Sequence, residues 1–197
     1  MNNISKNTRM TMLAIAMSLG CATGAMAMTS AEHKAQNERI EADCKAARDK
    51  CGTMSGNAKD ICVSEAKGAE KVAKAELEVQ YKPSAKNDVK VREAKADAAY
   101  DTAKEKCDDA TGNAKDVCVK DAKAAHTAAM GAAKVADASM SKTSGTNAKT
   151  AKVAEARQEA TADTRKAEYA AAKERCDAMS GNAKDACVAD AKTKYGM

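Results

Sequence analysis

Small apolar residues recur at three- and four-residue steps along most of this chain. One such stripe runs through Ile40, Cys44, Ala47 and Cys51. Residues at these steps share one face of an α-helix, because the helix turns once in 3.6 residues. No segment alternates between apolar and polar residues over a useful length, so the pattern predicts no strands. The sequence therefore predicts an all-α protein.

The same periodicity predicts about six helices. Thr29 and Glu32 have the spacing of a capping box at the start of the first helix. Pro83 ends the second, because the residue before a proline disfavours the helical backbone. The expected helices span residues 29–51, 58–81, 88–107, 114–140, 149–176 and 183–194.

A motif of two cysteines separated by ten residues, with Gly-Asn-Ala-Lys-Asp between them, occurs three times. Glycine is favoured just past the end of a helix, and asparagine is a good N-cap for the next one. Each copy is therefore predicted to be the turn of a helical hairpin. The cysteine pairs are Cys51 with Cys62, Cys107 with Cys118, and Cys176 with Cys187. The predicted turn residues are Gly56, Asn57, Gly112, Asn113, Gly181 and Asn182.

The hairpins organise the chain into three repeats, at residues 28–82, 83–140 and 149–197, with a linker at 141–148. The first cysteines are 56 and then 69 residues apart, so the third repeat follows an insertion of 13. Seams made of alanine bury little apolar surface. We therefore expect elongated hairpins with coiled-coil-like packing, and no compact central core.

Residues 1–27 are typical of a secretory signal peptide. Lys6 and Arg9 precede a short apolar run at residues 12–20, and residues 25–27 fit an A-x-A cleavage site. An uncleaved anchor is the alternative. A lipoprotein at Cys21 is less favoured, because Ser18 stands where such sites usually have leucine. We expect export to the periplasm.

Export favours disulfide formation, since cysteines oxidise outside the cytoplasm. Pairing within each motif is the prediction; pairing between repeats and free buried thiols are the alternatives. Removal of the signal leaves an odd cysteine, Cys44. It lies seven residues before Cys51, where the other repeats have Tyr100 and Tyr169. We expect a buried free thiol there, with an intermolecular disulfide or a reactive site as alternatives.

The charges are nearly balanced. The chain has 33 Lys and Arg against 28 Asp and Glu, and the signal segment holds two of the basic residues. Mixed signs along every helix describe a solvated surface and not a nucleic-acid footprint. Phe and Trp are absent, so no base-stacking platform is expected. No stretch of the mature chain is apolar enough to predict a stable membrane span.

No motif predicts catalysis, a cofactor or a metal. His33 and His126 lie in different repeats and far from cysteines, so we interpret them as surface residues. Zinc sites need Cys or His two to four residues apart, which a ten-residue spacing does not supply. Cys-x-x-Cys, P-loop and nucleophile-elbow motifs are absent from the sequence.

The Gly-Asn-Ala-Lys-Asp-x-Cys copies, flanked by Ala-Lys-Glu-Lys-Cys at 103–107 and Cys-Val-Lys-Asp-Ala-Lys at 118–123, carry a resemblance. The chain resembles a family of small exported Ala/Lys-rich bacterial proteins often labelled "cell envelope biogenesis protein TolA". The resemblance covers essentially the whole mature chain. It implies a helical periplasmic protein of the cell envelope, and it does not imply a role in the Tol system.

Three functions fit these features. The first is a non-enzymatic structural or interaction protein of the envelope, acting through protein partners or self-association. The second is a stress-type periplasmic chaperone or binding protein. The third is a redox or metal-handling protein that uses Cys44. The alanine stripes favour the first, because they leave little apolar surface to hold unfolded clients.

Overall fold

A computed structural model describes residues 27–142 and 145–197, and within these ranges every regular element is a helix. The all-α prediction is confirmed. The predicted signal segment up to residue 26, including Cys21, lies outside the described residues. The helices are α1 (Ser30–Cys51), α2 (Gly56–Tyr81), α3 (Ala85–Cys107), α4 (Gly112–Met140), α5 (Thr146–Cys176) and α6 (Gly181–Tyr195).

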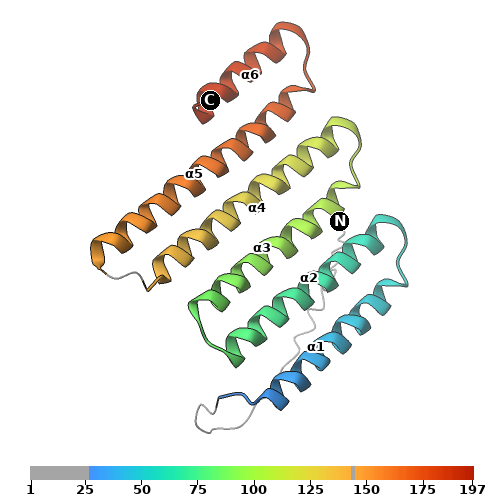
Figure 1. Ribbon diagram of the computed structural model, residues 1–197. Coiled ribbons are helices and arrows are strands. Elements are labelled where there is room, and N and C mark those ends of the chain that lie inside the picture. The colour runs from blue at the N-terminus through green and yellow to red at the C-terminus, as the bar shows by residue number, and fades with distance from the viewer. Residues whose placement is uncertain (1–26, 143–144) are drawn as a thin grey trace, which may run out of the picture.

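The helices lie side by side in chain order as a single antiparallel layer (Figure 1). Each helix contacts only the helix before it and the helix after it. The three bends inside the motifs lie along one edge of the layer, and the two linkers between hairpins lie along the opposite edge (Figure 1). The predicted array of hairpins without a central core is confirmed.

Capping residues decide where the helices begin. The Thr29 hydroxyl accepts a hydrogen bond from the Glu32 amide at 3.2 Å, and the Glu32 carboxylate accepts one from the Thr29 amide at 2.8 Å. This is the predicted capping box. The Ser84 hydroxyl accepts from the Asn87 amide, so α3 begins at Ala85 and not at 88. Helix α5 also begins three residues earlier than expected, at Thr146.

The buried residues are small. Among the described residues, only Leu77 and Val89 are larger than alanine or cysteine in the buried set, and no charged residue is buried. Small side chains allow neighbouring helix backbones to approach closely. The rest of the buried set is Cys44, Cys51, Ala96, Cys107, Ala122, Ala124, Ala133, Ala138, Ala171, Cys176 and Ala191, with the glycines Gly68 and Gly131.

Gly68 and Gly131 set the closest approach between successive hairpins. A Cβ on Gly68 of α2 would lie 2.8 Å from the Ala98 Cβ of α3. A Cβ on Gly131 of α4 would lie 2.8 Å from the Ala160 Cβ of α5. Both contacts therefore require glycine.

We call the contacts of α2 with α3 and of α4 with α5 the first and second joints between hairpins. The two joints share one register. Gly68 lies six residues after the second cysteine of its motif and Gly131 lies thirteen after. Their partners Ala98 and Ala160 lie nine and sixteen residues before the following first cysteine. Both separations from the cysteines are seven residues longer at the second joint than at the first. Seven residues make about two helical turns, so the contacting residues lie on the same helix face. The longer α4 and α5 thus extend the joint without changing how the hairpins pack.

Candidate functional site

Each motif forms a disulfide within its own repeat. The bonds join Cys51 to Cys62, Cys107 to Cys118, and Cys176 to Cys187, with Cα–Cα distances of 5.6, 5.5 and 5.7 Å. The first cysteine of each pair is the last residue of its helix and is buried. The second lies in the second turn of the next helix. A disulfide therefore links the two helices on either side of each bend.

The bend differs in detail from the prediction. The glycines Gly56, Gly112 and Gly181 have the expected positive φ, at 55°, 56° and 55°. They do not follow the preceding helix directly, because that helix has already ended at the cysteine, five residues earlier. The prediction that the glycine ends one helix and the asparagine caps the next was wrong.

The N-cap is instead the Ser or Thr before each glycine. Ser55, Thr111 and Ser180 have extended backbones, with φ of −133°, −130° and −137°. The helix then begins at the glycine itself. The extended residue lets the chain reverse direction, while backbone bonds such as Met54 N–H to Cys51 O, at 3.0 Å, tighten the turn before it.

One of the three motif asparagines, Asn113, bonds across a joint between hairpins. Asn113 Nδ2 donates to the Glu174 carbonyl of α5 at 2.8 Å, which ties the second bend to the third hairpin. The equivalent Nδ2 of Asn57 is buried and has no hydrogen-bond partner. Asn182, in the last repeat, is exposed. Sequence reasoning missed this role because the partner lies 61 residues away.

An ion pair closes the bend in two of the three repeats. Lys115 pairs with Asp108 at 3.0 Å, and Lys184 pairs with Asp177 at 2.8 Å. The hydrogen bond from Lys184 lowers the pKa of Asp177 and raises the pKa of Lys184. In the first repeat Gly52 stands at the position of Asp108 and Asp177, so the first bend has no equivalent ion pair.

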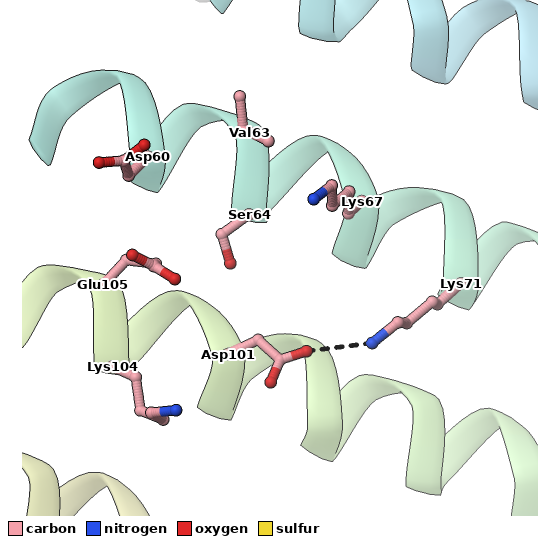
Figure 2. Close-up of a pocket in the computed structure, with 8 residues that line it drawn as sticks. All are labelled: Asp60, Val63, Ser64, Lys67, Lys71, Asp101, Lys104 and Glu105. Carbon is pink, nitrogen blue, oxygen red and sulfur yellow. Dashed lines mark hydrogen bonds and ion pairs between the residues drawn. The ribbon is translucent and has the colours of Figure 1, made fainter. Parts of the chain in front are cut away.

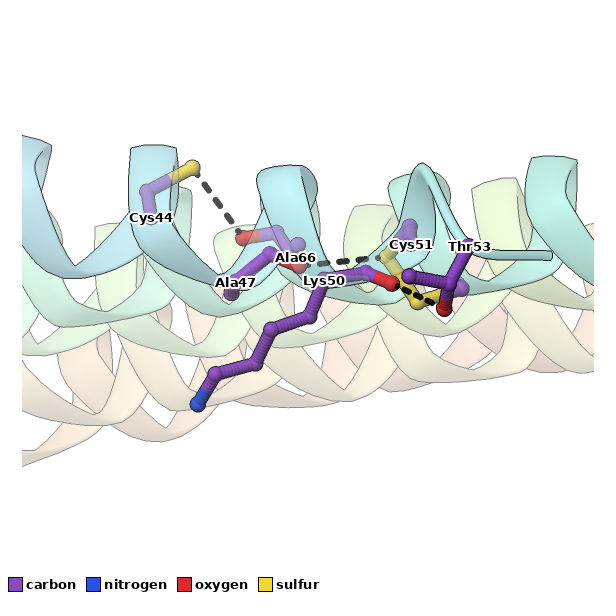
Figure 3. Close-up of a disulfide and its surroundings, with 7 residues drawn as sticks. Cys44, Ala47, Lys50, Cys51, Thr53 and Ala66 are labelled. Carbon is purple, nitrogen blue, oxygen red and sulfur yellow. Dashed lines mark hydrogen bonds between the residues drawn. A yellow bond between two sulfur atoms is a disulfide. The ribbon is translucent and has the colours of Figure 1, made fainter.

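Cys44 is the only free cysteine of the described residues, and it is buried between α1 and α2. Its Sγ lies 3.6 Å from the Ala66 carbonyl oxygen (Figure 3). Glu70 lines the same small pocket. Hydrogen bonding to Glu70 and then burial raise the pKa of Cys44.

Glu70 remains ionised beside this thiol. Hydrogen bonds from Cys44 and from Lys74 lower the pKa of Glu70, and the Lys74 ion pair measures 2.7 Å. The thiolate is the nucleophilic form of cysteine. A buried thiol that faces a carboxylate is therefore poorly suited to redox exchange.

Cys44 and Glu70 occupy one facing position that recurs in every hairpin. The position lies seven residues before the first cysteine and eight after the second. In the second repeat it holds Tyr100 and His126, whose rings stack with centroids 4.8 Å apart. In the third it holds Tyr169 and Tyr195. The sequence indicated one side of this position but not the residue opposite it.

The two histidines are partnered and partly buried, which corrects their interpretation as lone surface residues. His33 stacks on Tyr81 at 4.3 Å and its Nε2 lies 2.8 Å from Glu78 Oε1. His126 Nε2 lies 2.7 Å from Asp97 Oδ1. Each ring links two neighbouring helices. In the part of the chain that the structure describes, no group of three His, Cys, Asp or Glu side chains could hold a metal ion.

A groove between α2 and α3 is lined mainly by charged residues (Figure 2). Lys71 Nζ pairs with Asp101 Oδ2 across it at 3.0 Å. Basic and acidic residues are equal in number along the groove, so it presents no net charge to a ligand. Its lining residues are Asp60, Val63, Ser64, Lys67, Lys71, Asp101, Lys104 and Glu105.

None of the described helices combines the length and the hydrophobicity needed to cross a membrane. No family model, curated protein or solved structure matches this chain. The disulfide-bonded bends and the joints between hairpins are therefore the features that bear on function.

Proposed function

We propose that this chain is a non-enzymatic structural and interaction protein of the periplasm, in the cell-envelope setting that its TolA-like resemblance implies. The observation that carries the proposal is the disulfide at each of the three bends. Three such bonds fit an oxidising compartment. They hold an array whose small side chains bury little apolar surface.

The exposed surface supports a structural role over a chaperone role. The large apolar side chains exposed in the described ranges are Met54, Met179 and Met197, each about half exposed. Two of them lie at separate bends and the third ends the chain. Holding unfolded clients requires a contiguous apolar patch. Ion pairs such as Lys95 with Glu76 and Lys134 with Glu159 occupy the helix surfaces instead.

Peptide mapping under non-reducing conditions tests the proposal. The protein is expressed with its own N-terminus in a Gram-negative host, and the periplasmic and cytoplasmic fractions are separated. We expect a chain beginning at Met28 in the periplasm, with the three bonds within repeats and one free thiol at Cys44. A reduced chain confined to the cytoplasm would contradict the proposal.

A light-scattering assay with an aggregating client distinguishes the chaperone alternative. We expect no suppression of aggregation at a stoichiometric ratio of chain to client. A known periplasmic chaperone serves as the positive control. Full suppression by this chain would favour the binding-protein function instead.

A further inference from the structure

An ion pair recurs at both joints between hairpins. Lys106 Nζ of α3 lies 3.3 Å from Glu65 Oε1 of α2. Arg175 of α5 pairs in the same way with Asp121 of α4. The basic residue always lies one position before a first cysteine, and the acidic residue lies three positions after a second cysteine.

The two outer helices carry the halves of a third pair. Lys50 of α1 is the basic residue one position before Cys51, and Asp190 of α6 is the acidic residue three positions after Cys187. Both are exposed, and neither forms an ion pair with any residue that the structure describes. Figure 3 shows the Lys50 side chain extending away from the disulfide.

The rest of the outer surface of α1 also matches a joint. Ala42 has the same place relative to its cysteine as Ala98, which contacts Gly68 in the first joint. Ala42 and Ala46 are both exposed, so α1 presents a face of small residues on which no other described helix packs. On α6, Asn182 has the place of Asn113, which bonds across the second joint.

We propose that α6 of one molecule packs against α1 of a second copy of this chain, in the register of the joint between hairpins but without its closest glycine contact. The inference deepens the proposed structural role and rests on it, because it names the partner as the chain itself. The contact is heterologous, since it joins different surfaces of the two molecules. The array of described helices is one layer thick, and no other described helix covers α1 or α6 at its edges, so the contact extends it into longer chains.

The joint between molecules is weaker than the joints within one. Helix α6 is 15 residues long, against 26 for α2 and 29 for α4, so it covers only the bend-side half of a joint. Thr193 also stands in the place of Gly68, which prevents the closest approach. No linker holds the two helices together. Association is therefore reversible, dependent on concentration, and sensitive to salt because the pair is exposed.

Sedimentation velocity of the purified protein over a range of concentrations tests the proposal with a charge reversal on each side. We expect the weight-average sedimentation coefficient of the native chain to rise from the monomer value with concentration. Lys50→Glu and Asp190→Lys, each alone, should abolish the rise. The combined variant should restore it, because the opposite charges are exchanged and not lost.

Two control variants change charge by the same amounts away from the outer edges. Lys86→Glu lies on α3 and Asp109→Lys lies in the second bend; both residues are exposed, and neither pairs with an oppositely charged residue within 27–142 or 145–197. They should associate like the native chain, and circular dichroism should show equal helix content for every variant. A native chain that stays monomeric, or single reversals that associate unchanged, would overturn the proposal. Either outcome leaves the periplasmic structural role standing, because peptide mapping tests that role separately.

Discussion

Cys44 illustrates how a single side chain is controlled by the helix opposite. The residue is 5% exposed and faces Glu70, which raises the pKa of the Cys44 thiol. We expect native Cys44 to react with iodoacetamide at pH 8 more slowly than in the urea-unfolded chain, because the raised pKa of Cys44 lowers its thiolate fraction and burial restricts access of the reagent. Mass spectrometry of timed samples measures the rate.

Glu70→Gln provides the control for this rate. The substitution removes the negative charge but keeps the size of the side chain, so native Cys44 should react faster than in the unchanged protein and more slowly than when unfolded. Equal rates in the native and unfolded chains would show that the thiol is accessible and reactive. That result would revive the redox hypothesis.

Gly68 is the residue on which the first joint depends. In Gly68→Ala the new Cβ would lie 2.8 Å from the Ala98 Cβ. Overpacking of this kind costs about 1–3 kcal/mol, which opposes the gain of about 1 kcal/mol that alanine brings to a helix. We therefore expect a lower melting temperature by circular dichroism.

The reciprocal substitution separates steric clash from helix propensity. Gly68→Ala combined with Ala98→Gly moves the small residue to the other helix and should recover part of the loss. The double variant should be more stable than the sum of the two single effects. A Gly68→Ala chain that melts above the native chain would show that the joint does not limit stability.

Helices could be predicted from the sequence more completely than the bends that join them. Periodicity and capping residues placed the start of α1 and the ends at Cys51 and Tyr81, because these depend on local residues. The bends were misassigned because glycine and asparagine also suit helix ends. Extended Ser55, four residues past the end of α1, decides the geometry there. The bond from Asn113 to Glu174 needed knowledge of which hairpins are neighbours.

Helix α6 depends on its disulfide more than the other helices do. It contacts only α5, and a helix of 15 residues is marginal when isolated. Cys176→Ser with Cys187→Ser removes a cross-link worth roughly 3 kcal/mol for a loop of this length. We expect α6 to detach, so limited trypsin digestion should first cleave at the lysines after residue 181.

The second bend is the matched control. In Cys107→Ser with Cys118→Ser, α3 keeps its contact with α2 and α4 keeps its contact with α5. Trypsin should therefore cleave this variant more slowly at its open bend than it cleaves α6 in the first variant. Equal cleavage rates would mean that packing against one neighbour is enough to hold α6.

At the scale of the whole molecule, stability comes from a line of pairwise contacts and not from a shared core. The shortage of large apolar residues predicted an elongated array. The order of the joints, their common register and the outer edges could not be predicted, because they depend on contacts such as Gly68 with Ala98 between repeats. A one-layer array of this kind behaves as a quasi-one-dimensional system, in which each unit is stabilised only by its neighbours.

Such an array should open from its edges, and hydrogen exchange followed by mass spectrometry can measure this. We expect amides in α3 and α4 to exchange most slowly, because these two helices lie farthest from the outer helices α1 and α6 in the line of contacts. Amides in α1 and α6 should exchange fastest in dilute solution. If copies join through α6 and α1, protection of those two helices alone should rise with protein concentration, while α3 and α4 stay unchanged. One common exchange rate for all six helices would contradict the linear arrangement, since only a single cooperative core makes every helix open together.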